Sequence, residues 1–312
     1  MIGWLRKYRE GVGLDLGREA IKVVQLRNEK GRCTLTAWGR APVPPGAVDR
    51  GLVKNRDAVA DVIRGLFEAK DIASRKVIVA LSASSCFVRH LVLPSLSRRE
   101  VKRAARLQVE SQLPWTKEEA VVDVAVYEES RDSREVEVLV AAARKTAALE
   151  IEKTLKEAGL IPVAAEIAPL ACYRLLNPKC DDAGILLVDL GAGGIQFAYF
   201  AGGRLKMLRN VVLSPVDYDS LPVLANTAEE IRKTLEYAQV QQVAVEPTRV
   251  VITGGGAEKE GVKKELRSLL PYWQVSDVFD LADLAVVSEG ADLLGPSYAA
   301  ALGMALRGIR GN

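Results

Sequence analysis

Two short segments of the sequence place an aspartate at the end of an apolar strand, directly before a glycine turn. They read VGLDLGREAIKVV at residues 12–24 and ILLVDLGAGGIQFAYF at residues 185–200, with the aspartates at Asp15 and Asp189. Glycines in such turns let backbone N–H groups approach an anion, because no Cβ intervenes. A carboxylate at the strand end suits a hydrated divalent cation. Each segment alone could be a plain β-turn, but the pair favours a shared metal and phosphate site.

The first segment also predicts which side chain faces its aspartate. If Leu16 pairs with Ile21 across a four-residue loop, Asp15 lies opposite Lys22. Directly opposed residues of a hairpin project from the same face. We therefore expect a carboxylate suited to magnesium and an ammonium group suited to phosphate to face one cleft.

A third segment brings three consecutive glycines to the end of a buried strand. It reads VVITGGGAEKEGVKKEL at residues 250–266 and passes from Gly254, Gly255 and Gly256 straight into a predicted helix at 259–270. This arrangement places backbone N–H groups and the positive end of a helix dipole at a ligand. The alternative is a flexible strand-to-helix connection. The segment matches neither the G-x-x-x-x-G-K-[ST] phosphate loop nor the G-x-G-x-x-G dinucleotide fingerprint.

The elements that position these segments occur twice. The first copy has three strands, a helix and a returning strand, expected at 12–16, 21–27, 33–38, 55–69 and 76–81. The second copy is expected at 185–189, 195–201, 204–211, 227–240 and 249–253, with a last helix at 297–307. Strands that alternate with helical periods in this way indicate an α/β fold, and the repetition predicts a duplicated architecture.

A different order of strands and helices is expected between the two copies. Its order is strand, helix, strand, strand, helix, strand, expected at 87–93, 97–112, 121–128, 135–142, 147–158 and 161–167. This order is typical of a split βαβ module. Ser97 and Glu100 form a capping box at the start of its first helix, and Gly159 ends its second.

The composition narrows the class of protein. A length of 312 residues suits about two domains, and a net charge of +3 is too small for a general polyanion-binding field, so we expect no nucleic-acid partner. The four cysteines form no C-x-x-C pair and there is one histidine, which argues against a zinc site or a disulfide framework. No apolar stretch reaches the roughly 20 residues of a membrane span, and no signal peptide is recognisable. We therefore expect a cytoplasmic protein.

The three glycine-containing segments, in this order, resemble the two phosphate motifs and the adenosine motif of the actin-like ATPase superfamily. Within the superfamily the chain resembles the FtsA/PilM branch, and in particular the PilM family of type IV pilus assembly proteins. The residues that carry this resemblance are GLDLGREAIKVVQL at 13–26, LPSLSRREVKRAARLQVESQLPW at 93–115, VLVAAARKTAALEIEKTLKEAGLIPVAAEIAPLA at 138–171, AEEIRKTLEYAQVQ at 228–241 and YAAALGMALRG at 298–308.

The resemblance implies an α/β, actin-like fold, which is a duplicated ribonuclease H-like fold with the split βαβ module inserted in its first domain. The expected first domain is 1–85 with 169–183, and the helix at 297–308 packs back on it. The expected module is 86–168. The expected second domain is 184–296 and lacks most of an extra subdomain.

The resemblance also implies a function. Such proteins are scaffolds of the pilus inner-membrane platform with little or no ATPase activity, and they lie at the inner face of the cell membrane. They hold the N-terminal peptide of a PilN-like membrane protein in a groove between the first domain and its module, alongside other platform components.

In such proteins ATP and magnesium occupy the cleft between the domains. The implied roles here are Asp15 and Asp189 for magnesium, through water, and Lys22 for phosphate charge. The glycines expected to contact the nucleotide through their backbone are Gly17, Gly191, Gly193, Gly194, Gly254, Gly255 and Gly256. No catalytic residue is implied.

Two departures from the family pattern bear on nucleotide binding. A short connector, Ser214–Asn226, stands where relatives carry the extra subdomain that closes over the adenine. The first turn has Arg18 and Glu19 where relatives have small or hydroxyl residues, and Glu19 would repel a terminal phosphate if it faced the cleft, although Arg18 could offset it. Two alternatives stay open. One is a nucleotide-free pseudo-ATPase adaptor of a type II secretion-like system, and the other is a small-molecule kinase, which would need a catalytic base and a closing lobe.

Overall fold

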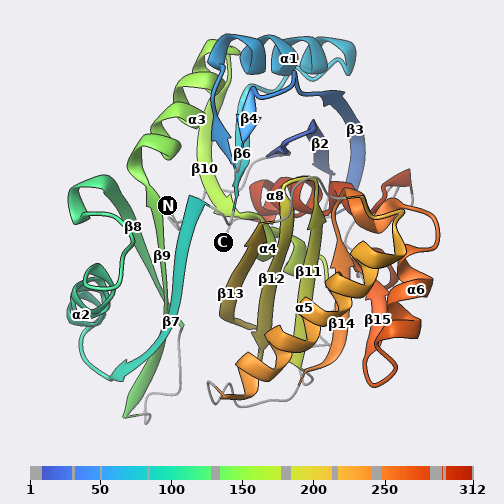
Figure 1. Ribbon diagram of the computed structural model, residues 1–312. Coiled ribbons are helices and arrows are strands. Elements are labelled where there is room, and N and C mark those ends of the chain that lie inside the picture. The colour runs from blue at the N-terminus through green and yellow to red at the C-terminus, as the bar shows by residue number, and fades with distance from the viewer. Residues whose placement is uncertain are drawn as a thin grey trace.

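The structure is a computed structural model of the chain. It contains two five-stranded sheets, a three-stranded sheet and a two-stranded ribbon (Figure 1). The described residues are 9–29, 32–49, 51–82, 85–127, 134–176, 184–212, 217–240, 247–281, 290 and 293–310. All ten residues predicted to bind a cofactor lie within this part of the chain.

The first sheet begins with an antiparallel meander and is extended by two parallel strands. Its strands, in order across the sheet, are β10 (Ile161–Ile167), β6 (Lys76–Leu81), β1 (Glu10–Leu16), β2 (Ala20–Glu29) and β3 (Arg32–Pro42). Successive side chains of a strand point to opposite faces. In β6, Val77 and Val79 therefore enter the core on one face while Ile78 and Ala80 enter the core on the other.

Helices α1 (Arg56–Ala69) and α3 (Lys145–Glu157) pack on one face of this sheet. Helix α1 begins after Asn55, whose side chain accepts a hydrogen bond from the Ala58 N–H at 3.2 Å, as expected of an N-cap residue. The short strands β4 (Val48–Asp49) and β5 (Leu52–Val53) form the ribbon. We call the first sheet with these helices the first lobe.

The second sheet repeats the first in strand order and direction. Its strands, in order, are β13 (Arg204–Val212), β12 (Gly194–Ala201), β11 (Gly184–Gly191), β14 (Pro247–Thr253) and β15 (Gln274–Asp277). Helices α5 (Leu221–Val240) and α6 (Val262–Leu269) pack on one face, and α7 (Val278–Leu281) follows β15. This sheet and its helices are the second lobe. The prediction of a duplicated architecture is confirmed.

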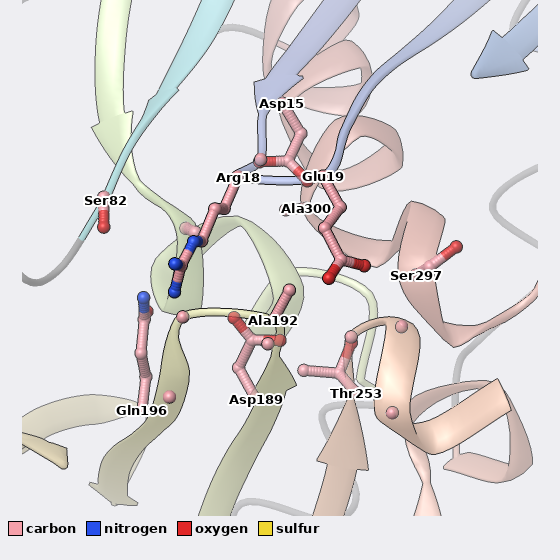
Figure 2. Close-up of a pocket in the computed structure, with 18 of the residues that line it drawn as sticks. Asp15, Arg18, Glu19, Ser82, Asp189, Ala192, Gln196, Thr253, Ser297 and Ala300 are labelled. Atoms are coloured by element: carbon pink, nitrogen blue, oxygen red, sulfur yellow. The ribbon is translucent and has the colours of Figure 1, made fainter. Parts of the chain in front are cut away.

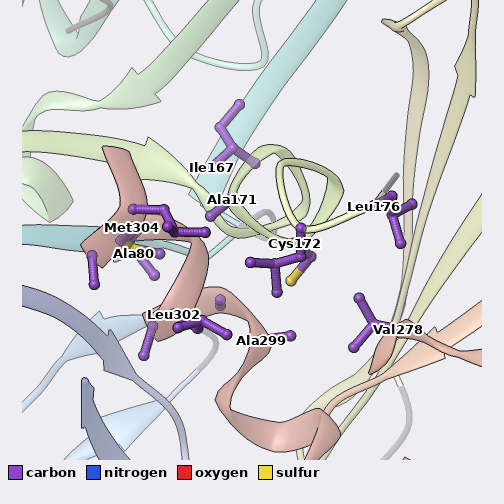
Figure 3. Close-up of a cluster of buried hydrophobic side chains, with 14 of the residues drawn as sticks. Ala80, Ile167, Ala171, Cys172, Leu176, Val278, Ala299, Leu302 and Met304 are labelled. Carbon is purple, nitrogen blue, oxygen red and sulfur yellow. The ribbon is translucent and has the colours of Figure 1, made fainter. Parts of the chain in front are cut away.

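Two helices lie between the lobes, α4 (Ala168–Tyr173) and α8 (Ala299–Arg310), and share a core with both sheets (Figures 1 and 3). A Cβ on Gly11 or Gly13 would stand 2.0 or 1.9 Å from a carbonyl oxygen of α8. Only glycine lets the helix approach β1 this closely. Helix α8 thus packs directly against β1, the strand that bears Asp15.

The module inserted after β6 has three strands, and the prediction of four is wrong. Its strand order is β7 (Cys86–Pro94), β9 (Glu135–Arg144) and β8 (Ala120–Val126), with α2 (Arg98–Glu110) on one face and a 3₁₀ turn at Lys117–Glu119. The fourth expected strand, β10, instead pairs in parallel with β6. Its buried residues Ala164 and Ile167 belong to the core between the lobes. The predicted capping box of Ser97 and Glu100 is confirmed.

A cluster of charged side chains joins the module to the second lobe. The Glu137 carboxylate of β9 forms ion pairs with Arg204 at 2.8 Å and with Lys206. It also lies 2.5 Å from the His90 Nε2. Burial alone would raise the pKa of Glu137, but the contacts with Lys206 and His90 lower it to about 2. The single histidine therefore has a structural partner.

The connector between β13 and α5 is short, as predicted. Helix α5 begins at Leu221, six residues before the predicted start at Thr227, so much of the connector is helical. Residues 214–216 of the connector lie outside the described residues, as does Cys180. Within the described part of the chain, no helix is both long and apolar enough to cross a membrane.

Candidate functional site

A cavity of about 480 Å³ lies between the two lobes and is lined by residues of both. This volume falls within the roughly 300–1,000 Å³ typical of small-molecule sites. Asp15 and Asp189 lie on facing hairpins (Figure 2). The predicted site residues that line the cavity are Asp15, Gly17, Lys22, Asp189, Gly191, Gly193, Gly194, Gly254, Gly255 and Gly256. The structure thus brings together all three segments found in the sequence.

The first hairpin has the predicted register. Leu16 pairs with Ile21 and Asp15 with Lys22. The Lys22 Nζ donates a hydrogen bond to the Asp15 Oδ2 at 3.2 Å, and the two side chains are only 14% and 20% exposed. The ammonium and carboxylate groups therefore face the cavity as a pair with no net charge.

The second hairpin has the same register with a different partner. Asp189 pairs with Gln196, and Gly191 pairs with Gly194 across the turn. The Tyr218 hydroxyl donates a hydrogen bond to the Gly191 carbonyl at 3.1 Å and so holds the turn. The Gln196 Oε1 is the buried side-chain oxygen or nitrogen that lacks a hydrogen-bond partner within the described residues. A neutral amide thus stands where the first hairpin has an ammonium group.

The two aspartates differ in how easily they ionise. Burial and then repulsion from Asp15 raise the pKa of Asp189 to about 6, against a smaller lowering by Lys22. Burial lowers the pKa of Lys22, but attraction to Asp15, and more weakly to two further carboxylates, raises it overall. An ionised Asp189 is therefore disfavoured by burial and by Asp15, and a cation bound beside it would favour the ionised form.

The triple-glycine bend forms the wall of the cavity beside Asp189. A Cβ on Gly254, where φ is +86°, would stand 2.2 Å from the Asp189 Oδ1. The Gly254 N–H donates to the Pro296 carbonyl at 3.2 Å and the Thr253 hydroxyl to the same oxygen at 2.8 Å. The bend is thereby tied to the 3₁₀ turn Pro296–Tyr298 that precedes α8.

The prediction of a helix starting directly after the bend is wrong. A 3₁₀ turn at Gly255–Glu258 follows Gly254, and α6 begins only at Val262, after Gly261 with φ +82°. The two glycines at positive φ interrupt a regular helix on either side of the turn. The dipole of α6 therefore does not begin at the cavity, and the wall is made by the 3₁₀ turn.

Three further residues of the site, Glu258, Tyr218 and Gln196, are not predicted by the sequence analysis. The Glu258 carboxylate accepts hydrogen bonds from the Ser297 N–H at 3.2 Å and hydroxyl at 2.6 Å, and so joins the bend to the region before α8. No spacing in the sequence signals these contacts or that of Tyr218. Gln196, in contrast, could have been found by applying to the second hairpin the register argument used for Lys22.

Arg18 and Glu19 of the first turn both line the cavity. Glu19 therefore faces the cleft, where it would repel a terminal phosphate. Arg18 lines the same cavity and its side chain extends toward the second hairpin (Figure 2).

The donor set fits a hydrated magnesium ion held with a phosphate ligand. Within the described residues no group of three or more His, Cys, Asp or Glu side chains could enclose a metal. Magnesium usually binds one or two carboxylates and takes its remaining ligands from water and phosphate. Asp15 and Asp189 supply that number of carboxylates.

Cys33, Cys86 and Cys172 are free.

Comparison with known proteins extends this description. The sequence model of the family described as type IV pilus assembly protein PilM matches residues 13–214, which is more than half of the chain. A solved structure described as a PilM-PilN type IV pilus biogenesis complex contains a chain that is 26% identical, with a TM-score of 0.83. That match covers 98% of this chain and 100% of the other.

Two more distant structures share the fold alone. The ethanolamine utilization protein EutJ from Carboxydothermus hydrogenoformans is 15% identical, with a TM-score of 0.54 over 97% of this chain and 92% of that one. A Bacteroides thetaiotaomicron protein of unknown function with an actin-like ATPase fold is 10% identical, with a TM-score of 0.50 over 90% and 96%. Together with the family match, these likenesses show that the chain has the actin-like ATPase fold and belongs to the PilM family of type IV pilus assembly proteins.

Proposed function

We propose that this protein is a scaffold of the type IV pilus inner-membrane platform that binds the N-terminal peptide of a PilN-like membrane protein. The observation that carries the proposal is the likeness, over 98% of this chain, to a chain of the PilM-PilN complex. The proposal places the protein in the cytoplasm, at the inner face of the cell membrane and beside other platform components.

The proposed peptide groove lies between the first lobe and the module. The sheet topology supports a module of about 86–144, with β10 returned to the first domain, and a second domain of 184–296. Val121 of the edge strand β8 is 41% exposed and pairs with Ala143, close to the start of α3 in the first lobe. An exposed apolar side chain at this junction suits an apolar peptide side chain.

The partner proposal is tested with a synthetic peptide that copies the N-terminus of the PilN-like protein. We expect calorimetric binding to the whole chain and none with a scrambled peptide. Val121→Asp should weaken binding at least about tenfold, since it puts a charge in an apolar contact. The matched control is Val92→Asp, which alters another exposed valine, on the opposite edge strand β7. Absence of binding to the wild type would remove the partner proposal.

We further propose that the cavity binds ATP with magnesium and hydrolyses it slowly or not at all. The two acidic hairpins and the glycine bend line one cavity, and this juxtaposition supports the proposal. Asp15 and Asp189 would hold magnesium through water, Lys22 would pair with a phosphate, and glycine N–H groups of the turns would contact phosphate oxygens. Magnesium would neutralise phosphate charge beside the two carboxylates.

Titration calorimetry and thermal unfolding with magnesium and ATP test this second proposal. A ligand present at about 100 times its Kd stabilises the folded state by about 2.7 kcal/mol. We expect a clear rise in the unfolding temperature with magnesium-ATP, a smaller one with Asp189→Ala, and little phosphate release. No heat and no thermal shift at millimolar ATP would show a nucleotide-free adaptor instead.

A further inference from the structure

Helix α2 of the module carries a concentrated positive charge. The helix packs on the module's own sheet and lies away from both lobes (Figure 1). Its basic residues are Arg98, Arg99, Lys102, Arg103 and Arg106, and its acidic residues are Glu100 and Glu110. The resulting surplus of three positive charges equals the net charge of the whole chain. One helix thus gathers a surplus as large as that of the entire protein.

Three of the arginines form the outer face of the helix. Residues three and four apart share a helix face. The residues that face the sheet are Val101, Ala105 and Val109. Arg99, Arg103 and Arg106 lie on the opposite side and are exposed. Among the described residues, no carboxylate pairs with Arg99 or Arg103. The outer face therefore presents guanidinium groups that the protein does not neutralise.

This placement of charge weakens the helix itself. Positive side chains are unfavourable near a helix N-terminus, where the helix dipole is positive. Arg98 and Arg99 nevertheless occupy the first turn, whereas the last turn has no basic residue. Like charges four residues apart also repel each other, as Arg99 and Arg103 do. An anion bound to the outer face would relieve both effects, so the pattern favours an anionic partner over a solvated surface.

Exposed leucines accompany the arginines. Leu107 lies four residues after Arg103, on the same face, and is 60% exposed, and Leu96, directly before the helix, is 54% exposed. Basic and apolar side chains together on an exposed helix suit the boundary between lipid headgroups and acyl chains. Arginine can also donate two parallel hydrogen bonds to one phosphate group. The phosphates of anionic phospholipids therefore fit the chemistry of this face.

The basic face lies beside the proposed peptide groove. The Arg106 Nη2 donates a hydrogen bond to the Val122 carbonyl of β8 at 3.0 Å. Val121 of the same strand lies at the proposed groove. A peptide that emerges from a membrane protein would bring this side of the module close to the lipid. The choice of a lipid surface over an acidic protein segment rests in this way on the partner part of the proposed function.

We propose that the outer face of α2 binds the surface of a membrane that contains anionic phospholipid. Arg99, Arg103 and Arg106 contact headgroup phosphates, and Leu107 enters the boundary between headgroups and acyl chains. The contact adds to the attachment through the partner peptide, because two linked contacts bind more tightly than either alone. It goes beyond the proposed function, which requires no contact with lipid.

Co-sedimentation of the full chain with vesicles tests this inference. The vesicles contain either phosphatidylcholine alone or equal parts of phosphatidylcholine and phosphatidylglycerol. We expect binding to the anionic vesicles alone, and weaker binding as the salt concentration rises. Arg99→Glu changes the charge by two units and should weaken binding about 10- to 30-fold. Leu107→Ala should weaken it about two- to fivefold, because less apolar surface enters the lipid.

Arg99→Glu also separates lipid binding from folding. A glutamate in the first turn complements the helix dipole and can pair with Arg103 four residues later, so the unfolding temperature should not fall. The matched control is Lys264→Glu, which makes the same change of charge at an exposed residue of α6 in the second lobe. This control should leave vesicle binding unchanged.

Three results would overturn the inference. The first is that the wild type does not bind anionic vesicles, and the second is that Arg99→Glu and Lys264→Glu weaken binding equally. The third is that the wild type binds a polyglutamate peptide but no vesicles, which would assign the face to an acidic protein segment. Calorimetry with the PilN-like peptide keeps the two proposals distinct, because Arg99→Glu should bind that peptide as the wild type does. Vesicle binding without peptide binding would remove the partner proposal and leave the lipid contact.

Discussion

The first hairpin holds its aspartate against an ammonium group, whereas the second holds its aspartate against an amide. Asp15 pairs with Lys22 and Asp189 with Gln196 at equivalent positions of two hairpins with the same register. The Lys22 ammonium donates to Asp15 at 3.2 Å. The pKa of Asp189, in contrast, is raised to about 6 by burial and by Asp15. The two copies of the fold thus hold one aspartate in an ion pair and place the other opposite a neutral amide.

The two aspartates therefore have different effects on stability before any ligand binds. The ion pair of the first hairpin stabilises the fold, whereas an ionised Asp189 opposes it. Under the proposed function, the same charge that opposes folding would attract a metal ion, which is the usual relation between stability and a binding site. Substitutions at equivalent positions should therefore have opposite effects.

The largest effect is expected where the glycine bend meets the second hairpin. In Gly254→Ala the new Cβ would stand 2.2 Å from the Asp189 Oδ1 and 2.8 Å from the Leu190 carbonyl oxygen, at a φ of +86°. We expect a loss of about 3 kcal/mol or more in the free energy of unfolding, measured in urea. Gly255→Ala is the control, because no atom lies within 4 Å of its Cβ position. Equal losses in both variants would contradict this account of the bend.

The next largest loss of stability is expected when the aspartate of the first hairpin is replaced. Asp15→Asn leaves the Lys22 ammonium, 14% exposed, without its carboxylate. We expect a loss of about 2 kcal/mol, between the values for exposed and buried ion pairs. Urea unfolding of the ligand-free chain at pH 7 measures it. An unchanged stability would mean that the first hairpin is no more neutralised than the second.

At the equivalent position of the second hairpin, removal of the acid should instead increase the free energy of unfolding. Asp189→Asn removes a carboxyl whose pKa is raised to about 6 from 3.8. Such a shift corresponds to at most about 3 kcal/mol of destabilisation at neutral pH. Because the cavity admits water, we expect Asp189→Asn to stabilise the ligand-free chain by about 1–2 kcal/mol at pH 7. A destabilised variant would show that Asp189 is already compensated.

How much of this comparison the sequence could predict depends on how local the contacts are. The pairing of Asp15 with Lys22 follows from a seven-residue separation within one hairpin, and the same logic extends to Gln196. The contact of Tyr218 with Gly191 joins separate elements through tertiary packing, so no spacing signals it. A strand pattern likewise does not specify which sheet a strand joins, so the sequence could not predict that β10 pairs with β6. The late start of α6 followed from the backbone conformation of Gly261, which the helical period conceals.

A pH series tests the same difference without removing a side chain. A carboxyl with a raised folded-state pKa takes up a proton in the folded state first, so its destabilising effect is full above pH 6 and is lost as the pH falls toward 4. We expect the gain from Asp189→Asn to shrink by about 1 kcal/mol or more between pH 7 and pH 4.5, in paired urea titrations. A gain independent of pH would show that the effect is steric.

The smallest effect is expected when the second hairpin is given the partner of the first. In Gln196→Lys an ammonium group would stand opposite Asp189 in the register of the pair. An opposite charge favours the ionised carboxylate, so the pKa of Asp189 should fall below about 6 and the chain should gain up to about 1 kcal/mol at pH 7. The burial of a second ammonium group limits the gain. The double variant with Asp189→Asn is the control, because there the new lysine has no carboxylate to face. If Gln196→Lys changes stability equally in both backgrounds, the ammonium does not act through Asp189, and the contrast between the hairpins has another origin.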